Sequence, residues 1–325
     1  MFLLKYFYRF AVVLALTPAA PGHAQDYPAR PIRLIAGSSA GGGGDGVARV
    51  MAAKFTVALK QQMVVDNRPG AAGNIGAEMV ARAAPDGYTL LFGYTGHVIN
   101  PALFKTLPFD PLRDFAPVGL IAFNQSALVV NPAVPAQSVK ELIALAKSRP
   151  GKLSMGTLVG GSQHLAGELF KTQAGVDILV VPYKGNGPAT NDLIAGQVDI
   201  MFNTLALVVP LVKAGRLRAL AVAGEKRSEL MPDLPTVGEA ALKGFSSSGW
   251  YGILAPAATP RGVIVKLNAT LNSVLRDPDT LQRIKAMGNE ITPGAPLTPE
   301  QFDAFIRAEI PKWRDVARRA GVRQE

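Results

Sequence analysis

Short apolar runs alternate along this chain with longer stretches in which apolar residues recur at helical spacing. The run Ile32–Ile35 is bounded by Pro31 and Gly37, and helical spacing then extends from Val47 to Leu59. A second apolar run follows at 63–65, and another helical stretch and strand follow at 74–83 and 89–92. This alternation predicts βαβ units, in which a parallel sheet is covered by helices.

The same pattern restarts near residue 128. Ser138-Val-Lys-Glu141 forms a capping box that predicts a helix to Ser148, and Thr298 opens another box before a helix to Ala320. Further strands are predicted at 128–130, 153–156, 178–181, 200–202, 217–222 and 250–254. The final helices lack enough strands for a third domain, so we expect them to complete the first one.

The predicted fold is therefore α/β with two lobes, each a mainly parallel sheet flanked by helices. Lobe 1 comprises residues 25–125 and 248–325, and lobe 2 comprises residues 126–247. Two chain crossings between the lobes would form a hinge, with a ligand cleft between the lobes.

Composition narrows the functional classes. The chain has 325 residues, 48% of them hydrophobic, which suits a globular protein with a sizeable core. It contains no cysteine, which excludes disulfides, thiolate metal sites and cysteine nucleophiles. The net charge is +10, but no dense run of lysine and arginine predicts a nucleic-acid partner, so small anions fit this charge better.

The first 24 residues have the pattern of a secretory signal peptide. Lys5 and Arg9 precede the apolar run Phe10–Leu16, and small residues lead to Ala24. The apolar run is much shorter than the roughly 20 residues of a spanning helix. We therefore expect cleavage after Ala24 and export to the periplasm.

The glycine-rich turn at 37–46 permits three interpretations. Gly41 to Gly46 matches the dinucleotide pattern G-x-G-x-x-G, and Asp66 lies at the distance expected of a ribose-binding acid. Gly37 to Gly41 also matches the hydrolase pattern G-x-S-x-G, with Ser39 as nucleophile and His97 or His164 as base. In the third interpretation, backbone N–H groups at a helix N-terminus bind a carboxylate without any catalysis.

Other candidate residues follow predicted strands or open predicted helices. Thr95 and His97 follow the strand at 89–92, and Asn203 and Thr204 follow the strand at 200–202. Such carboxyl ends of parallel strands line binding crevices. Ser162 is predicted to cap the helix that carries His164. No histidine–carboxylate cluster has the spacing of a metal site.

Several segments together carry a family resemblance. The chain resembles the periplasmic substrate receptors of tripartite tricarboxylate transporters, the Bug family. The matching segments are Tyr27–Arg33 with the glycine turn, Asp66–Gly76, Ala84–Leu90, Ser162–Phe170, Val181–Gly185, Gly196–Asp199, Lys213–Ala221 and Leu234–Val237. Their joint order spans the predicted mature chain.

The resemblance implies a two-lobed periplasmic binding protein that clamps a carboxylate with one loop from each lobe. These loops match Gly37–Asp45 and Thr157–His164. It implies no cofactor, no metal and no catalysis, a di- or tricarboxylate, amino acid or aromatic carboxylate as ligand, a monomeric state and a membrane permease as partner. The expected ligand-binding residues are Gly37, Ser38, Ser39, Gly41, Gly42, Asp45, Thr95, His97, Thr157, Gly161, Ser162, His164, Asn203 and Thr204.

Overall fold

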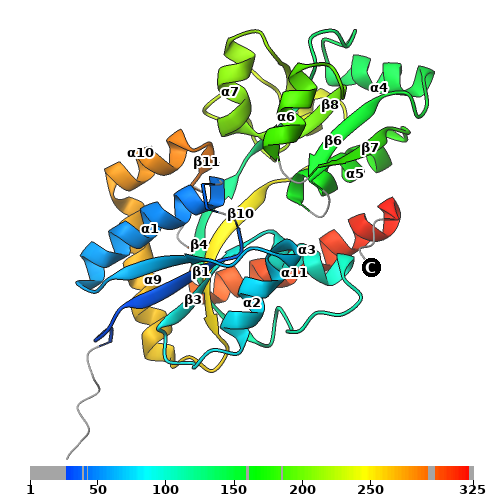
Figure 1. Ribbon diagram of the computed structural model, residues 1–325. Coiled ribbons are helices and arrows are strands. Elements are labelled where there is room, and N and C mark those ends of the chain that lie inside the picture. Colours follow the sequence, from blue (N-terminus) through cyan, green and yellow to red (C-terminus); the bar gives the residue numbers. More distant parts are fainter. Residues whose placement is uncertain are drawn as a thin grey trace, which may run out of the picture.

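The computed structural model describes residues 27–38, 40–41, 43–158, 161–183, 186–291 and 297–321. The predicted signal peptide therefore lies outside the described residues. The described chain forms two lobes, one above the other in Figure 1, and each is built on its own sheet. The predicted two-lobed α/β fold is confirmed.

Lobe 1 is built on a six-stranded sheet with the strand order β11-β4-β10-β3-β1-β2. β1 pairs in parallel with β2 and β3, whereas β10 runs antiparallel to both β3 and β4. The sheet is thus more mixed than the predicted mainly parallel one. Its strands are β1 Ile32–Ala36, β2 Met63–Asn67, β3 Thr89–Tyr94, β4 Phe115–Asn124, β10 Gly249–Pro256 and β11 Asn289–Glu290.

Lobe 2 is built on a five-stranded sheet with the order β7-β6-β8-β5-β9. β6 pairs in parallel with β7 and β8, and β5 runs antiparallel to β8 and β9. This sheet is also mixed, because β5 enters it directly from lobe 1. Its strands are β5 Ser126–Val130, β6 Ser154–Leu158, β7 Leu179–Tyr183, β8 Ile200–Thr204 and β9 Arg218–Val222.

Helices cover both faces of each sheet, so each lobe has two apolar cores. In lobe 1, one face packs against α1 Gly43–Leu59, α9 Arg261–Arg276 and α10 Pro278–Ala286. The other face packs against α2 Asn74–Ala81, α3 Gly96–Leu103 and α11 Pro299–Ala320. In lobe 2 the covering helices are α4 Val139–Ser148, α5 Ser162–Ala174, α6 Asn186–Ile194, α7 Leu205–Lys213 and α8 Val237–Ala240.

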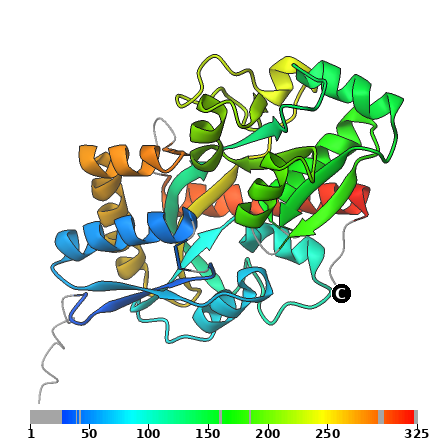
Figure 2. The same cartoon turned by 45° about the horizontal axis from the view of Figure 1, so that its top comes forward.

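The chain passes between the lobes twice. β4 leads through Gln125 into β5, and the segment after β9 returns to lobe 1 at the start of β10. Figure 1 shows these crossing strands side by side between the lobes. α11 also reaches across, because it packs on β4 and contacts α5 of lobe 2 (Figure 2).

One predicted helix cap differs in the structure. Gly161, with extended backbone, is the N-cap of α5, so Ser162 is its first helical residue rather than its cap. The predicted N-caps at Ser138 and Thr298 are present, since each side chain accepts a hydrogen bond from the third residue of its helix. The box is reciprocal at Thr298, whereas Glu141 accepts from the N–H of Gln137 instead of that of Ser138. Sequence spacing identifies a cap only to within a residue, because the adjacent turn decides which residue enters the helix.

Candidate functional site

The predicted ligand residues follow the carboxyl ends of β1 and β3 in lobe 1 and of β6 and β8 in lobe 2. In both sheets these strands lie on the same side of the crossing strands. We call this side of the molecule the loop side. The described residues include all the predicted ones except Ser39 and Gly42.

The glycine turn after β1 is held by a close backbone contact. A β-carbon built on Gly37 would lie only 2.9 Å from the Cα of Gly73 and 3.3 Å from the ring of Tyr94. Tyr94 in turn donates its hydroxyl to the carbonyl of Ala72 (2.7 Å). Gly37 is therefore needed where two turns meet, which is a packing reason for glycine at this position.

Asp45 holds the same turn from the first turn of α1. Its side chain is 3% exposed, and its carboxylate accepts hydrogen bonds from Gly41 N (2.9 Å), Arg49 Nε (2.9 Å) and Asn67 Nδ2 (2.9 Å). Burial alone would raise the pKa of Asp45, but the hydrogen bonds from Arg49, Gly41 and Asn67 lower it below its usual value. The carboxylate thus stays ionised and positions the turn.

Asn67, which is not among the expected ligand-binding residues, also holds the turn. Besides contacting Asp45, its amide donates to the carbonyl of Ser38 (3.0 Å). Gly41 has a φ of +80°, and its N–H is used by Asp45 rather than left for a ligand. The turn is therefore shaped by β2 as well as by its own glycines.

Thr95 and Ser162 come together at the crossing strand β10, although they belong to different lobes. A β-carbon built on Gly249 would lie 3.2 Å from Oγ1 of Thr95 and 3.5 Å from Oγ of Ser162. The Thr95 hydroxyl also accepts a hydrogen bond from the N–H of Trp250 (2.8 Å). Gly249 thus leaves the space in which polar groups of the two lobes approach each other.

A second polar group lies in lobe 2, at the end of β8 and the start of α5. Gln163 Nε2 lies 3.4 Å from Oγ1 of Thr204, and the Asn203 amide donates to Thr190 Oγ1 (2.7 Å). Gln163 is not among the expected ligand-binding residues. Its position in the first turn of α5 is the one sequence feature that could have predicted this contact.

Thr157 differs from these residues because its hydroxyl has no hydrogen-bond partner among the described residues. Its side chain is 1% exposed and lies at the end of β6, just before the loop that precedes α5. A buried polar atom without a partner carries a desolvation cost, and a bound ligand or water removes that cost.

The two histidines of the described chain occupy different surroundings. His97 lies on α3 within an aromatic cluster, 4.8 Å from Phe115 between ring centroids, and its Nε2 lies 2.9 Å from the carbonyl oxygen of Pro111. His164 is 4% exposed in α5, with Nε2 3.9 Å from Glu168 Oε1. His164 lies in the first turn of α5, two residues after Ser162, whereas the described contacts of the His97 ring are with Pro111, Phe109 and Phe115.

Burial lowers the pKa of both histidines. The pKa of His97 falls to about 4, because desolvation outweighs the hydrogen bond to Pro111. The pKa of His164 also falls to about 4, through burial and then the positive charge of Lys171. Both rings are therefore neutral at neutral pH, and the candidate residues carry a single ionised group, Asp45.

The described residues offer neither a membrane span nor a metal-binding cluster. None of the helices described there combines the length and the apolar character needed to span a bilayer. Across the same residues, no three histidine or carboxylate side chains gather in a way that would hold a metal ion.

Comparison with known proteins places this geometry in a family. The model of the tripartite tricarboxylate transporter family receptor matches residues 47–322. The chain belongs to this receptor family. The matched region begins just after the glycine turn, so the turn itself contributes nothing to the match.

Solved structures of the family are closely similar. The R. palustris protein Rpa4515, solved with adipate, is 36% identical, with a TM-score of 0.83 over 92% of this chain and 100% of its own. The periplasmic binding protein BugD is 36% identical, with a TM-score of 0.80 and the same coverage. MatC of Rhodopseudomonas palustris, solved with malate, is 32% identical, with a TM-score of 0.79 over 89% and 99% of the two chains.

Proposed function

We propose that this chain is a non-catalytic periplasmic receptor that binds a small carboxylate between its lobes, for uptake or sensing. The observation that carries the proposal is the approach of Thr95 and Ser162 at Gly249, because it joins polar groups of both lobes next to the crossing strands. Ligand contact from both lobes is what favours a closed conformation.

The chemistry of the loop side suits an anion. It offers the N-terminus of α5, short hydroxyl side chains and the unpartnered Thr157 hydroxyl, and the one carboxylate among the candidate residues, that of Asp45, is already bonded within lobe 1. Rpa4515 and MatC, whose structures hold adipate and malate, add support for a dicarboxylate. We propose the fourteen residues named from the sequence as the ligand-binding set, with Asp45 positioning the first loop.

Export, cleavage after Ala24, a monomeric state and a membrane permease as partner belong to the same proposal. They rest on the signal-like N-terminal segment and on membership of the receptor family.

Calorimetric titration of the protein from residue 25 onward tests the proposal. Adipate and malate are the probes, and hexane-1,6-diol is the uncharged analogue of adipate. We expect saturable one-to-one binding of a carboxylate and none of the diol. Failure of every member of a wider panel of carboxylates to bind would refute the proposal.

Thr157→Val is the sharpest single test of the site, because valine keeps the shape of threonine and removes only the hydroxyl. Since that hydroxyl has no partner, the substitution leaves the free energy of unfolding unchanged or raises it. We expect ligand affinity to fall by about tenfold. Unchanged affinity would remove Thr157 from the binding set.

The alternative is a serine hydrolase that uses Ser39. It predicts turnover of p-nitrophenyl acetate that is lost in Ser39→Ala, whereas a receptor binds its ligand and releases it unchanged. His97, one of its two candidate bases, is engaged with Pro111 and the aromatic cluster, which favours the receptor.

A further inference from the structure

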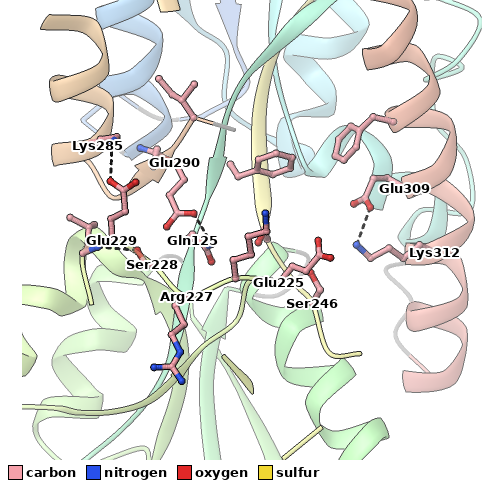
Figure 3. A pocket seen from close by; sticks show the side chains of 17 residues that line it. Gln125, Glu225, Arg227, Ser228, Glu229, Ser246, Lys285, Glu290, Glu309 and Lys312 are labelled. Atoms are coloured by element: carbon pink, nitrogen blue, oxygen red, sulfur yellow. Dashed lines mark hydrogen bonds and ion pairs between the residues drawn. The ribbon is translucent and has the colours of Figure 1, made fainter. Parts of the chain in front are cut away.

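A groove of about 570 Å³ lies between the lobes, away from the residues predicted to bind the ligand. It is lined by the crossing at Phe123 and Gln125, the segments 225–230 and 246–248, the end of α10, β11 and the middle of α11. None of the fourteen predicted ligand residues lines it. We call it the rear groove, and Figure 3 shows its side chains.

Sheet order places the rear groove opposite the loop side. In lobe 1, β11 flanks the crossing strands on one edge, and β3 and β1 flank them on the other. In lobe 2, β9 lies beyond β5 on one side, and β8 and β6 lie on the other. The rear groove is formed at β11 and after β9, so it is a separate site.

Three shielded acceptor oxygens in the rear groove have no hydrogen-bond partner among the described residues. They are Gln125 Oε1, Asn289 Oδ1 and Glu290 Oε1. The side chains of Gln125 and Asn289 are only 4% and 3% exposed. Buried acceptors without donors are unusual and indicate a missing donor.

The neighbouring hydrogen bonds fix which amide atom is the oxygen. Gln125 Nε2 donates to Glu290 Oε2 (3.0 Å), and a carboxylate only accepts, so the Gln125 oxygen must point elsewhere (Figure 3). Asn289 Nδ2 donates to the carbonyl of Met287 (3.1 Å), which fixes its oxygen in the same way. All three unpartnered atoms therefore require N–H or O–H donors.

The charges of the rear groove favour a cation. Three of its basic side chains are already paired with carboxylates: Arg227 with Glu239, Lys285 with Glu229, and Lys312 with Glu309. In the described part of the chain, Glu290 forms no such ion pair. Two further charged side chains line the groove without an ion pair among the described residues, the acidic Glu225 and the basic Lys226. With Glu290 they leave two negative charges against one positive charge.

We propose that the rear groove binds a small organic ammonium compound with an apolar body. A primary ammonium brings one positive charge and three N–H donors, which suit the three unpartnered oxygens, one of which belongs to the Glu290 carboxylate. The side chains of Phe123, Ile291 and Phe305 also line the groove and provide an apolar wall for the rest of the ligand.

The probe is 2-phenylethylamine, and 2-phenylethanol is its neutral analogue. The chain has two tryptophans, Trp250 and Trp313, and both adjoin the groove: Trp250 packs 5.9 Å from Phe305, and Trp313 Nε1 donates to Glu309 (2.8 Å). Their indole N–H resonances therefore report binding. We expect saturable shifts with a Kd of about 1 mM or tighter for the amine, and none for the alcohol.

Substitutions test whether the amine binds in the rear groove. Glu290→Gln keeps the shape of the side chain, and we expect it to weaken amine binding by about tenfold or more. Glu78→Gln is the matched control, because Glu78 is also half-buried but lies on α2 and pairs with Arg82. Ile291→Lys, which tethers an ammonium at the groove wall, is expected to block the probe even if Glu290→Gln folds poorly.

Three results would overturn the proposal. They are an absence of saturable amine binding to the unmodified protein, equal binding by Glu290→Gln, and equal binding of the neutral alcohol. None of them depends on the carboxylate site, so this test stands apart from that of the proposed receptor function.

Discussion

The two sides of the crossing strands differ in the hydrogen-bonding groups that they leave unused. Among the candidate residues of the loop side, the one carboxylate, that of Asp45, has three donors, and the histidines are neutral. In the rear groove, three acceptor oxygens have none. The comparison teaches that net charge is a poor guide to ligand chemistry, since a chain of charge +10 carries a groove suited to a cation.

The two sides also differ in how they are supported. The loop side depends on close backbone packing and on a buried hydrogen-bond network within lobe 1. The rear groove is spanned by an ion pair between Glu229 of lobe 2 and Lys285 of lobe 1 (2.8 Å), both of which are exposed. Substitutions on the loop side should therefore cost more stability than substitutions at the rear.

Gly37→Ala is expected to have the largest effect. The added β-carbon would lie 2.9 Å from the backbone of Gly73, and backbone cannot move aside as a side-chain end can. We expect the free energy of unfolding, measured by urea denaturation, to fall by about 3 kcal/mol. Gly262→Ala on α9 is the control, because nothing lies within 4 Å of its β-carbon position. Equal effects at both glycines would contradict the packing argument.

Asp45→Ala is expected to cause the second-largest loss of stability. It leaves the Gly41 N–H and the Asn67 amide without their acceptor in a buried place, and we expect a loss of about 2 kcal/mol. Asp315→Ala is the matched control, because Asp315 pairs with Arg318 and Arg319 on the exposed surface of α11, where an ion pair contributes little to stability. Loss of carboxylate binding with unchanged stability would instead make Asp45 a direct ligand group.

The pH dependence of stability contrasts two environments, because His164 lies on the loop side and His97 lies in an aromatic core. Their folded pKa of about 4 lies below the unfolded value, so the unfolded chain takes up protons first as the pH falls. Stability should thus decrease between pH 6.5 and 4, by about 1 kcal/mol per histidine between pH 7 and 5.5.

Urea denaturation at several pH values, with His164→Asn and His97→Asn, checks this prediction. We expect each substitution to remove a similar part of the pH dependence. If only His97→Asn does so, His164 is more hydrated than the aromatic cluster around His97, and the loop side is open to water.

Most strands were predictable because each contains a short apolar run. β4 was not, since Pro117 and Gly119 interrupt its pattern; the structure accommodates Pro117 beside a register shift against β10. α3 was missed for a similar reason, because it begins with Gly96 and contains Pro101.

The site was predictable only in part. The position of the loops could be predicted because loops at the carboxyl ends of parallel strands line binding crevices. The contacts of Asn67 and Gln163 could not, because they depend on how segments distant in the sequence meet. The rear groove draws its residues from six such segments, so no local motif could indicate it.

The smallest expected effect concerns the rear ion pair. Closure on the loop side would separate the lobes at the rear, so Lys285→Ala should favour closure and raise carboxylate affinity by about twofold or less. Its effect on the free energy of unfolding should stay below about 0.5 kcal/mol, because both partners are exposed. Lys312→Ala is the control, since Lys312 pairs with Glu309 within α11 and spans no lobe boundary (Figure 3). An equal change in affinity from both lysines would mean that general charge, rather than a link across the hinge, accounts for the effect.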